Sequence, residues 1–202
     1  MNYEVEFWKS VVSGMGKSRV PILSYEPQRR QVPPGLLDVF SSWKGIESIL
    51  ADIITKWNIG TGRCLEFGVE RGYSTSALAA FFDSVTGVDT FMGDKHTGFR
   101  EDIYEATKQR LYPFTNVQVF RSSYQEWIAK DESFYDMIHV DIIHTYIDTF
   151  NCGLWSAKHS QCTIFHDTES FRTVKQAVTD IARETNKTFY NFKECYGLGI
   201  LI

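Results

Sequence analysis

The stretch from Arg63 to Asp89 constrains the fold of this chain more than any other. It opens with a short apolar run, Cys64 to Phe67, followed by a turn with two glycines, a helical pattern and a second apolar run that ends on the aspartate. A strand, a glycine turn, a helix, a second strand and a terminal acid form the first half of a nucleotide-binding α/β unit. The sequence therefore predicts an α/β fold with a ligand site beside the turn.

The residues of this turn have separate physical roles. Gly68 and Gly72 allow the backbone to turn tightly and to approach a ligand, because a side chain there would clash or forbid a positive φ. Ser74 or Thr75 is expected to cap the following helix, whose free N–H groups would face the ligand. Asp89 ends the second strand, where its two carboxylate oxygens are expected to bind a ribose diol.

The acidic character of the turn separates two kinds of ligand. Its pattern is ExGxxxG, which begins at Glu66 and has Val69 and Glu70 between the two glycines. Two carboxylates would repel the pyrophosphate of a dinucleotide, whereas they suit a cofactor with an ammonium and a sulfonium group. The turn thus resembles motif I of the class I S-adenosylmethionine methyltransferases. On this stretch alone, an ordinary α/β unit without a ligand stays open as an alternative.

Strands and helices are expected to alternate along the rest of the chain. Further helices are predicted at 45–57, 100–111, 124–129, 147–155 and around 174–182, and further strands at 117–120, 136–141, 162–165, 187–192 and 198–202. This alternation predicts a three-layer αβα Rossmann-like fold with a mostly parallel, seven-stranded sheet, similar to that of the methyltransferases. The last two strands have no helix between them and predict a C-terminal antiparallel hairpin. Residues 1–44 are expected to form an N-terminal arm or lid, and residues 45–202 the catalytic domain.

Composition restricts the partners and the compartment. The 202 residues carry a net charge of -4 without a basic tract, which disfavours a nucleic-acid partner. The four cysteines have no CxxC spacing and are expected to be reduced thiols, and no apolar run is long enough to span a membrane. We therefore expect a cytoplasmic protein without a membrane partner. The aromatic, proline-bearing arm leaves a homo-oligomer open.

Acidic and amphoteric residues end four of the predicted strands. In an open parallel sheet the ligand site lies at the carboxyl ends of the strands, so these residues are expected to meet at one edge. Asp141 and Asp167 could jointly hold a hard divalent cation through oxygen ligands, and His144 lies within reach of the same edge. His166 could bind the metal, orient Asp167 or contact the substrate. His139, within a central strand, is expected to be a packed core histidine.

Three blocks of sequence then identify a family. The segments Ile138–Tyr146, Ile164–Thr168 and Gly87–Gly98 resemble the I-H-x-D-G-x-H-T-Y, F-H-D-T and V-D-T-W-x-G-D-x-H-x-G blocks of one group of class I methyltransferases. This group includes the sugar and macrolide-glycoside O-methyltransferases and is described as methyltransferase 24-like. The resemblance covers roughly residues 45 to 180 and does not extend to the arm or the final hairpin.

The resemblance implies S-adenosylmethionine-dependent O-methylation of a small molecule or a sugar or glycan intermediate, often with Mg²⁺ as a second cofactor. It implies that Asp141 and Asp167 bind the metal. His166 is a further candidate ligand from its position in the sequence. It also implies that His144 deprotonates the acceptor hydroxyl, with Asp141 as its catalytic partner. The residues expected to bind S-adenosylmethionine are Glu66, Gly68, Val69, Gly72, Ser74, Asp89, Thr90, Ser122, Ser123 and Asp141.

Two positions depart from the family pattern. Ile142 stands where the family has glycine after the aspartate of the fourth strand, and it could reshape the loop that carries His144. Ser122 and Ser123 stand where many members have an acid or a polar pair near adenine, although a hydroxyl can still form a hydrogen bond there.

Two other functions stay open from the sequence. His139-Val-Asp141 with a later histidine imitates the two-histidine, one-carboxylate site of a non-heme iron oxygenase or hydroxylase, although the helix-rich pattern differs from the β-barrel that usually carries it. A catalytically inactive cofactor-binding protein of the same fold is the other alternative, which Ile142 and Ile143 favour.

Overall fold

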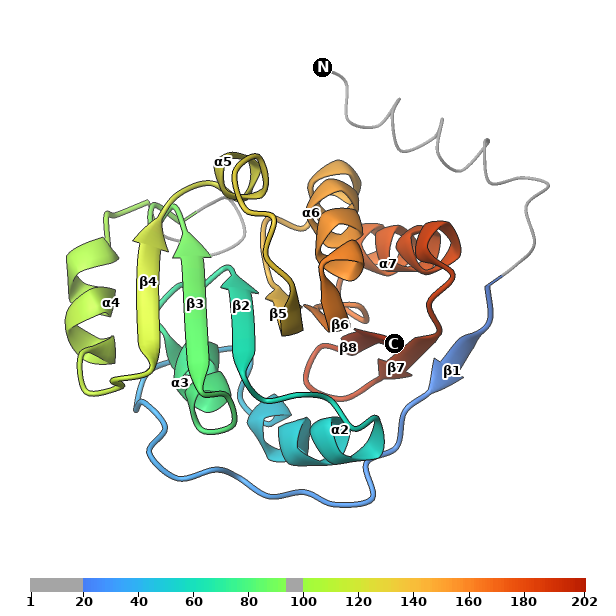
Figure 1. The fold of residues 1–202 in the computed structure, drawn as a ribbon, viewed down its shortest axis with the longest axis horizontal. Helices are drawn as coiled ribbons and strands as arrows, with labels where there is room; N and C mark the ends of the chain where they lie inside the picture. Colours follow the sequence, from blue (N-terminus) through green and yellow to red (C-terminus); the bar gives the residue numbers. More distant parts are fainter. Residues whose placement is uncertain (1–19, 94–99) are drawn as a thin grey trace.

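The computed structural model describes residues 20–93 and 100–202. Within them, an eight-stranded sheet forms the middle layer and helices cover both of its faces (Figure 1). The start of the predicted arm, residues 1–19, lies outside the described residues, and so do residues 94–99, which include part of the Gly87–Gly98 block.

The sheet has the predicted arrangement with one additional strand. Its order is β1-β7-β8-β6-β5-β2-β3-β4, and β8 is antiparallel to both neighbours while the other adjacent pairs are parallel. The mostly parallel sheet and the C-terminal antiparallel hairpin are therefore confirmed. The strands are β1 (Ile22–Ser24), β2 (Arg63–Phe67), β3 (Ser84–Asp89), β4 (Val117–Arg121), β5 (Tyr135–Val140), β6 (Ser160–His166), β7 (Phe189–Phe192) and β8 (Leu198–Leu201).

Two apolar cores separate the layers. On one face, Cys64 of β2 packs in a core with η1, α2 and α3, whereas the adjacent Leu65 belongs to the core under α6 and α7 on the other face. Because alternate residues of a central strand are buried on opposite faces, such strands appear in the sequence as continuous apolar runs. The helical elements are η1 (Ile46–Ile49), α2 (Leu50–Lys56), α3 (Tyr73–Ala79), α4 (Tyr104–Leu111), α5 (Tyr124–Ile128), α6 (Tyr146–Lys158) and α7 (Arg172–Thr185).

Three local features differ from the sequence-based expectations. Part of the predicted arm forms β1, which pairs in parallel with β7 and gives the sheet its eighth strand. The charged helix expected from Arg100 begins at Tyr104. The expected serine or threonine cap of α3 is wrong, because Gly72 is the N-cap residue, with φ of 89°, and no side chain caps the helix.

In the part of the chain that the structure describes, the helices lack the combination of length and apolar character that crossing a membrane requires.

Candidate active site

Gly68 allows the glycine turn to pack directly against the end of β5. Its φ is +93°, and a Cβ atom at this position would lie 1.7 Å from the backbone carbonyl oxygen of Asp141. The backbone N–H of Asp141 in turn donates to the carbonyl of Phe67 at 2.8 Å. The glycine is therefore required by the neighbouring chain segment, and its absence of a side chain places the turn directly against Asp141.

Asp89 is held at the tip of β3 by backbone donors from both sides. Its Oδ2 accepts from the N–H of Glu70 at 2.8 Å, and its Oδ1 accepts from the N–H of Phe91 at 2.7 Å. Burial raises the pKa of Asp89, although these backbone N–H groups partly counteract the rise. Its carboxylate has further acceptor capacity and borders a cavity, as a diol-binding residue requires.

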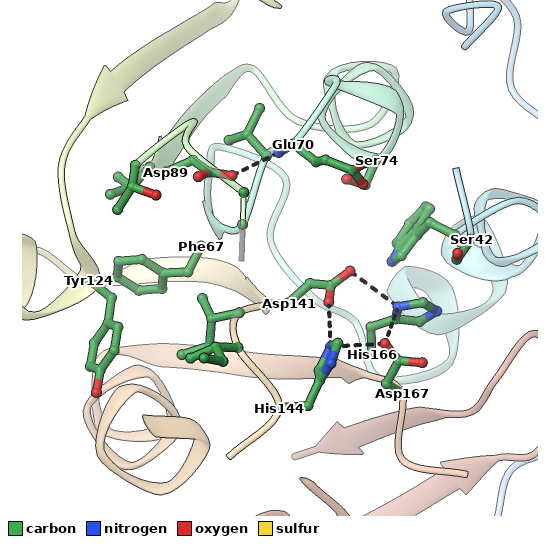
Figure 2. A pocket seen from close by; sticks show the side chains of 18 of the residues that line it. Ser42, Phe67, Glu70, Ser74, Asp89, Tyr124, Asp141, His144, His166 and Asp167 are labelled. Atoms are coloured by element: carbon green, nitrogen blue, oxygen red, sulfur yellow. Dashed lines mark hydrogen bonds and ion pairs between the residues drawn. The ribbon is translucent and has the colours of Figure 1, made fainter. Parts of the chain in front are cut away.

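This cavity lies along the carboxyl ends of the strands and has a volume of about 660 Å³. It is bordered by the glycine turn, by the ends of β3, β4 and β5, and by residues 40–43 of the segment before η1. The structure thus brings most of the predicted site residues to one space (Figure 2). The predicted residues that line it are Gly68, Val69, Ser74, Asp89, Thr90, Ser122, Ser123, Asp141, His144, His166 and Asp167.

Glu66 and Gly72 are the predicted cofactor residues that do not line the cavity. The Glu66 side chain is 0% exposed; its Oε1 lies 2.9 Å from His139 Nδ1, and its Oε2 accepts from the Thr75 hydroxyl. Gly72 serves as the start of α3, and a Cβ atom there would contact Leu111 at 3.0 Å. A direct contact of either residue with a cofactor stays a prediction.

Trp43 also lines the cavity, although none of the sequence motifs includes it. Its indole N–H donates to His139 Nε2 at 3.1 Å, so His139 carries its proton on Nδ1 and donates it to Glu66. His139 is therefore a packed core histidine. Since both of its ring nitrogens are already hydrogen-bonded, it has none to offer a metal, and the iron site suggested by His139-Val-Asp141 loses its first ligand.

Four side chains form an alternating ring of carboxylates and imidazoles at the other side of the cavity (Figure 2). His144 Nε2 lies 3.0 Å from Asp167 Oδ2 and 3.5 Å from Asp141 Oδ1. His166 Nδ1 lies 3.1 Å from Asp141 Oδ2 and 3.4 Å from Asp167 Oδ2. We call these four residues the Asp–His ring.

The elements around the ring fix its members. Asp141 follows β5, His166 is the last residue of β6, and Asp167 follows it in the left-handed region with φ of 64°. His144 lies in the loop before α6, stacks on Phe171 with ring centroids 4.2 Å apart, and accepts a hydrogen bond on its carbonyl from Thr173.

Ile142 does not prevent this arrangement. It is not among the described non-glycine residues with positive φ, so the loop needs no glycine at that position. Its side chain packs partly against the core under α6 and α7. His144 therefore reaches both carboxylates in spite of the departure from the family pattern.

The charges of the ring shift the pKa values of its members. Burial opposes charge on His144, but hydrogen bonds and the negative charges of Asp141 and Asp167 raise the pKa of His144 to about 9. The pKa of His166 is raised against the same effect of burial, by the charge of Asp141 above all. Burial would raise the pKa of Asp141, yet the two imidazoles hold it well below its ordinary value.

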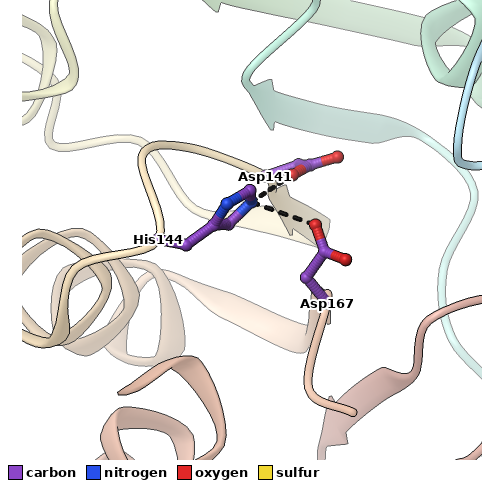
Figure 3. A group of neighbouring side chains, drawn as sticks. All are labelled: Asp141, His144 and Asp167. Atoms are coloured by element: carbon purple, nitrogen blue, oxygen red, sulfur yellow. Dashed lines mark ion pairs between the residues drawn. The ribbon is translucent and has the colours of Figure 1, made fainter. Parts of the chain in front are cut away.

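The ring has donors that fit a divalent metal ion. One ligand atom from each of Asp141, His144 and Asp167 can be chosen so that the three lie within 4.8 Å of one another (Figure 3). When both imidazoles are neutral, the two carboxylates leave a net negative charge that a cation would neutralise. Asp141 borders both this group and the glycine turn, so a metal and a cofactor would be neighbours.

The same fold occurs in solved methyltransferase structures. A Klebsiella pneumoniae protein, provisionally described as an O-methyltransferase, aligns with a TM-score of 0.57 and 14% identity over 83% of each chain. TomG, an O-methyltransferase of tomaymycin synthesis from Streptomyces achromogenes solved with SAM, aligns with a TM-score of 0.51 and 14% identity, over 74% of this chain and 75% of TomG. A Streptococcus mutans protein, provisionally described as a methyltransferase and solved with SAH, has a TM-score of 0.55 and 11% identity, over 72% of this chain and 91% of its own.

These similarities establish the class of fold. The chain has the α/β Rossmann-like fold of S-adenosylmethionine-dependent methyltransferases. No protein-family model matches the sequence, and no curated protein sequence matches it either. The narrower resemblance to the methyltransferase 24-like group therefore stays a prediction.

Proposed function

We propose that this protein is an S-adenosylmethionine-dependent O-methyltransferase that acts on a hydroxyl of a small molecule or of a sugar or glycan intermediate, assisted by a divalent metal ion. One observation carries the proposal: a single cavity is bordered at one side by the glycine turn with Asp89 and at the other by the Asp–His ring. Gly68 and Asp141 connect the two sides in direct backbone contact.

The glycine-turn side suits the cofactor. Asp89 would accept the ribose hydroxyls, and Ser122 and Ser123, at the end of β4, would border the adenine. Glu70 also lines the cavity, and burial together with the charge of Asp141 raises its pKa. The positive ammonium and sulfonium groups of S-adenosylmethionine would be attracted to these neighbouring carboxylates.

The Asp–His ring suits the acceptor. His144 would remove the proton from the acceptor hydroxyl and hold it on Nε2, which lies 3.0 Å from Asp167 Oδ2 and 3.5 Å from Asp141 Oδ1. When bound, S-adenosylmethionine would supply the methyl group for the acceptor oxygen, and its sulfur would leave with the electron pair as a neutral thioether.

A metal ion at the ring would make this base effective. Without a metal, the two carboxylates raise the pKa of His144 to about 9, so the protonated form is favoured at neutral pH. A cation held by Asp141, Asp167 and His166 would remove much of that stabilisation and return His144 to its neutral form. The same cation would lower the pKa of an acceptor hydroxyl and orient its oxygen.

Calorimetric titration with S-adenosylmethionine and its demethylated product tests the cofactor part of this proposal. We expect micromolar binding by the wild type, loss of binding in Asp89→Ala, and unchanged binding in Asp83→Ala, which removes an exposed aspartate just before β3. Equal binding by all three proteins, or none by the wild type, would refute the cofactor site.

A further inference from the structure

His166 differs from the other polar residues of the ring because a backbone group determines its tautomer. Its side chain is 2% exposed, and its Nε2 lies 3.2 Å from the carbonyl oxygen of Cys195. A carbonyl oxygen only accepts, so Nε2 carries a proton and donates it. In the neutral imidazole, Nδ1 then presents a lone pair toward Asp141 and Asp167. Two arrangements balance these charges: a second proton on Nδ1 donated to Asp141, at 3.1 Å, or a cation between the nitrogen and the carboxylates.

The carbonyl that fixes His166 belongs to an unfavourable turn. Cys195 and Tyr196 have φ values of 52° and 66°, and the N–H of Gly197 donates to Glu194 at 2.9 Å, which closes a hairpin turn with two left-handed central residues. Such turns normally contain asparagine and glycine, because side chains disfavour positive φ. Without a glycine at either central position, this turn still directs the Cys195 carbonyl onto His166.

The turn is also fastened to the chain that follows Asp167. The carbonyl of Tyr196 accepts from the N–H groups of Glu169 at 2.9 Å and Ser170 at 3.2 Å. A Cβ atom at Gly197 would lie 2.4 Å from the Glu169 nitrogen, so the two segments are packed backbone to backbone. The hairpin therefore holds both His166 and the segment next to Asp167.

The spacing of the donor atoms agrees with a metal site. Bonds of about 2.0–2.2 Å to one ion place neighbouring ligands of a tetrahedral or octahedral site about 2.8–3.6 Å apart. His166 Nδ1 lies 3.1 Å from Asp141 Oδ2 and 3.4 Å from Asp167 Oδ2. A metal-binding histidine commonly donates its other ring N–H to a backbone carbonyl, as His166 does to Cys195.

We propose that His166 Nδ1, Asp141 and Asp167 form a mixed nitrogen and oxygen site that selects a divalent transition ion such as Mn²⁺, Fe²⁺, Co²⁺ or Zn²⁺ over Mg²⁺. Mg²⁺ prefers oxygen ligands, whereas an imidazole nitrogen favours the transition ions. The inference refines the metal of the proposed O-methyltransferase, and metal binding can be measured without cofactor or acceptor. His144 shares the carboxylates and remains the base.

Titration of chelator-treated protein with Mn²⁺, Zn²⁺ and Mg²⁺ tests the selectivity. The wild type should bind Mn²⁺ and Zn²⁺ at least about 100-fold more tightly than Mg²⁺, following the preference of imidazole for transition ions. His166→Glu supplies an oxygen ligand and should reduce this ratio by about tenfold or more. His144→Gln and His159→Gln should keep the ratio, the first as a test of the ligand assignment and the second as a remote histidine control.

A measurement on the wild type avoids dependence on the folding of the variants. Pulsed electron paramagnetic resonance of the Mn²⁺-loaded protein should detect a directly coordinated ¹⁴N nucleus. Absence of that signal, an affinity for Mg²⁺ equal to that for Mn²⁺, or loss of metal binding in His144→Gln would overturn the proposal. Selective metal binding without S-adenosylmethionine binding would instead refute the proposed methyltransferase and leave the metal site standing.

Discussion

Two histidine–carboxylate clusters lie near the same cavity and differ in how completely they are satisfied. In the first cluster, one ring nitrogen of His139 contacts the carboxylate of Glu66, and the other accepts from the indole N–H of Trp43. The side chains of His139 and Glu66 are both 0% exposed. In the second, the Asp–His ring, two imidazoles share two carboxylates beside the cavity. The first cluster uses all the hydrogen-bonding capacity of its histidine within the protein, whereas the second concentrates negative charge that a proton or a metal must balance.

This difference separates a structural histidine from a functional one. Both clusters begin at the carboxyl ends of neighbouring parallel strands, β2 and β5 in one case and β5 and β6 in the other. A residue pattern alone does not separate the two clusters, but a comparison of the hydrogen-bond partners of their histidines does. We therefore expect changes in the first cluster to affect folding. Changes in the second cluster should chiefly affect metal binding and the transfer of the proton and the methyl group.

The largest effect on stability should follow Glu66→Ala. The change leaves His139 and the Thr75 hydroxyl without their buried acceptor, which should cost about 3–5 kcal/mol in the free energy of unfolding. Urea denaturation measures this loss. Glu66→Gln retains one oxygen acceptor and should lose clearly less. If both variants are as stable as the wild type, the first cluster has no structural role.

His144→Gln should produce a large effect on turnover in the metal-loaded protein. Loss of a positioned base should lower kcat by about 10²–10⁴-fold while the affinity for S-adenosylmethionine stays unchanged. Transfer of a labelled methyl group to an acceptor found by screening measures kcat. A variant that retains wild-type turnover would show that the proton goes to another group.

The metal-free protein should become less stable as the pH rises from 7 to about 10. The folded state raises the pKa of His144 from its ordinary 6.5 to about 9, so its contribution is complete below pH 6.5 and is lost as the pH passes 9. The loss should be about 2–3 kcal/mol. Denaturation at several pH values measures it; a bound divalent ion should flatten the profile. A metal-free profile identical in His144→Gln would contradict the assignment.

The smallest effect should follow Trp43→Phe. The ring volume is largely kept, but the indole donor to His139 is lost, which should cost about 1–2 kcal/mol. Because Trp43 also borders the cavity, the segment at residues 40–43 should become more mobile. Thermal denaturation and amide hydrogen exchange measure both effects. Trp57→Phe, at a partly buried tryptophan on the same side of the sheet, serves as the matched control.

The sequence predicted much of the fold because the central strands are buried on both faces and therefore appear as short apolar runs. It also predicted which side chains meet at the cavity, since the carboxyl ends of parallel strands share one edge. It did not predict β1, because all three residues of this strand are exposed and its pairing with β7 depends on the backbone.

Other features of the site depend on contacts between distant segments. Glu66 has the position of a cofactor ligand at the end of β2, and only its contacts with His139 and Thr75 direct it into the core. The turn at Cys195 and Tyr196 contains neither of the residues typical of a left-handed turn, so no sequence signal marked its contact with His166.

A crystal structure of the protein with the demethylated cofactor is the most direct test of the central claim that one cavity serves cofactor and acceptor. The ribose hydroxyls should lie on Asp89, the backbone of the Gly68 turn along the cofactor, and the sulfur should be directed toward Asp141 and His144. Binding of the cofactor elsewhere, or with its sulfur directed away from the Asp–His ring, would contradict the account.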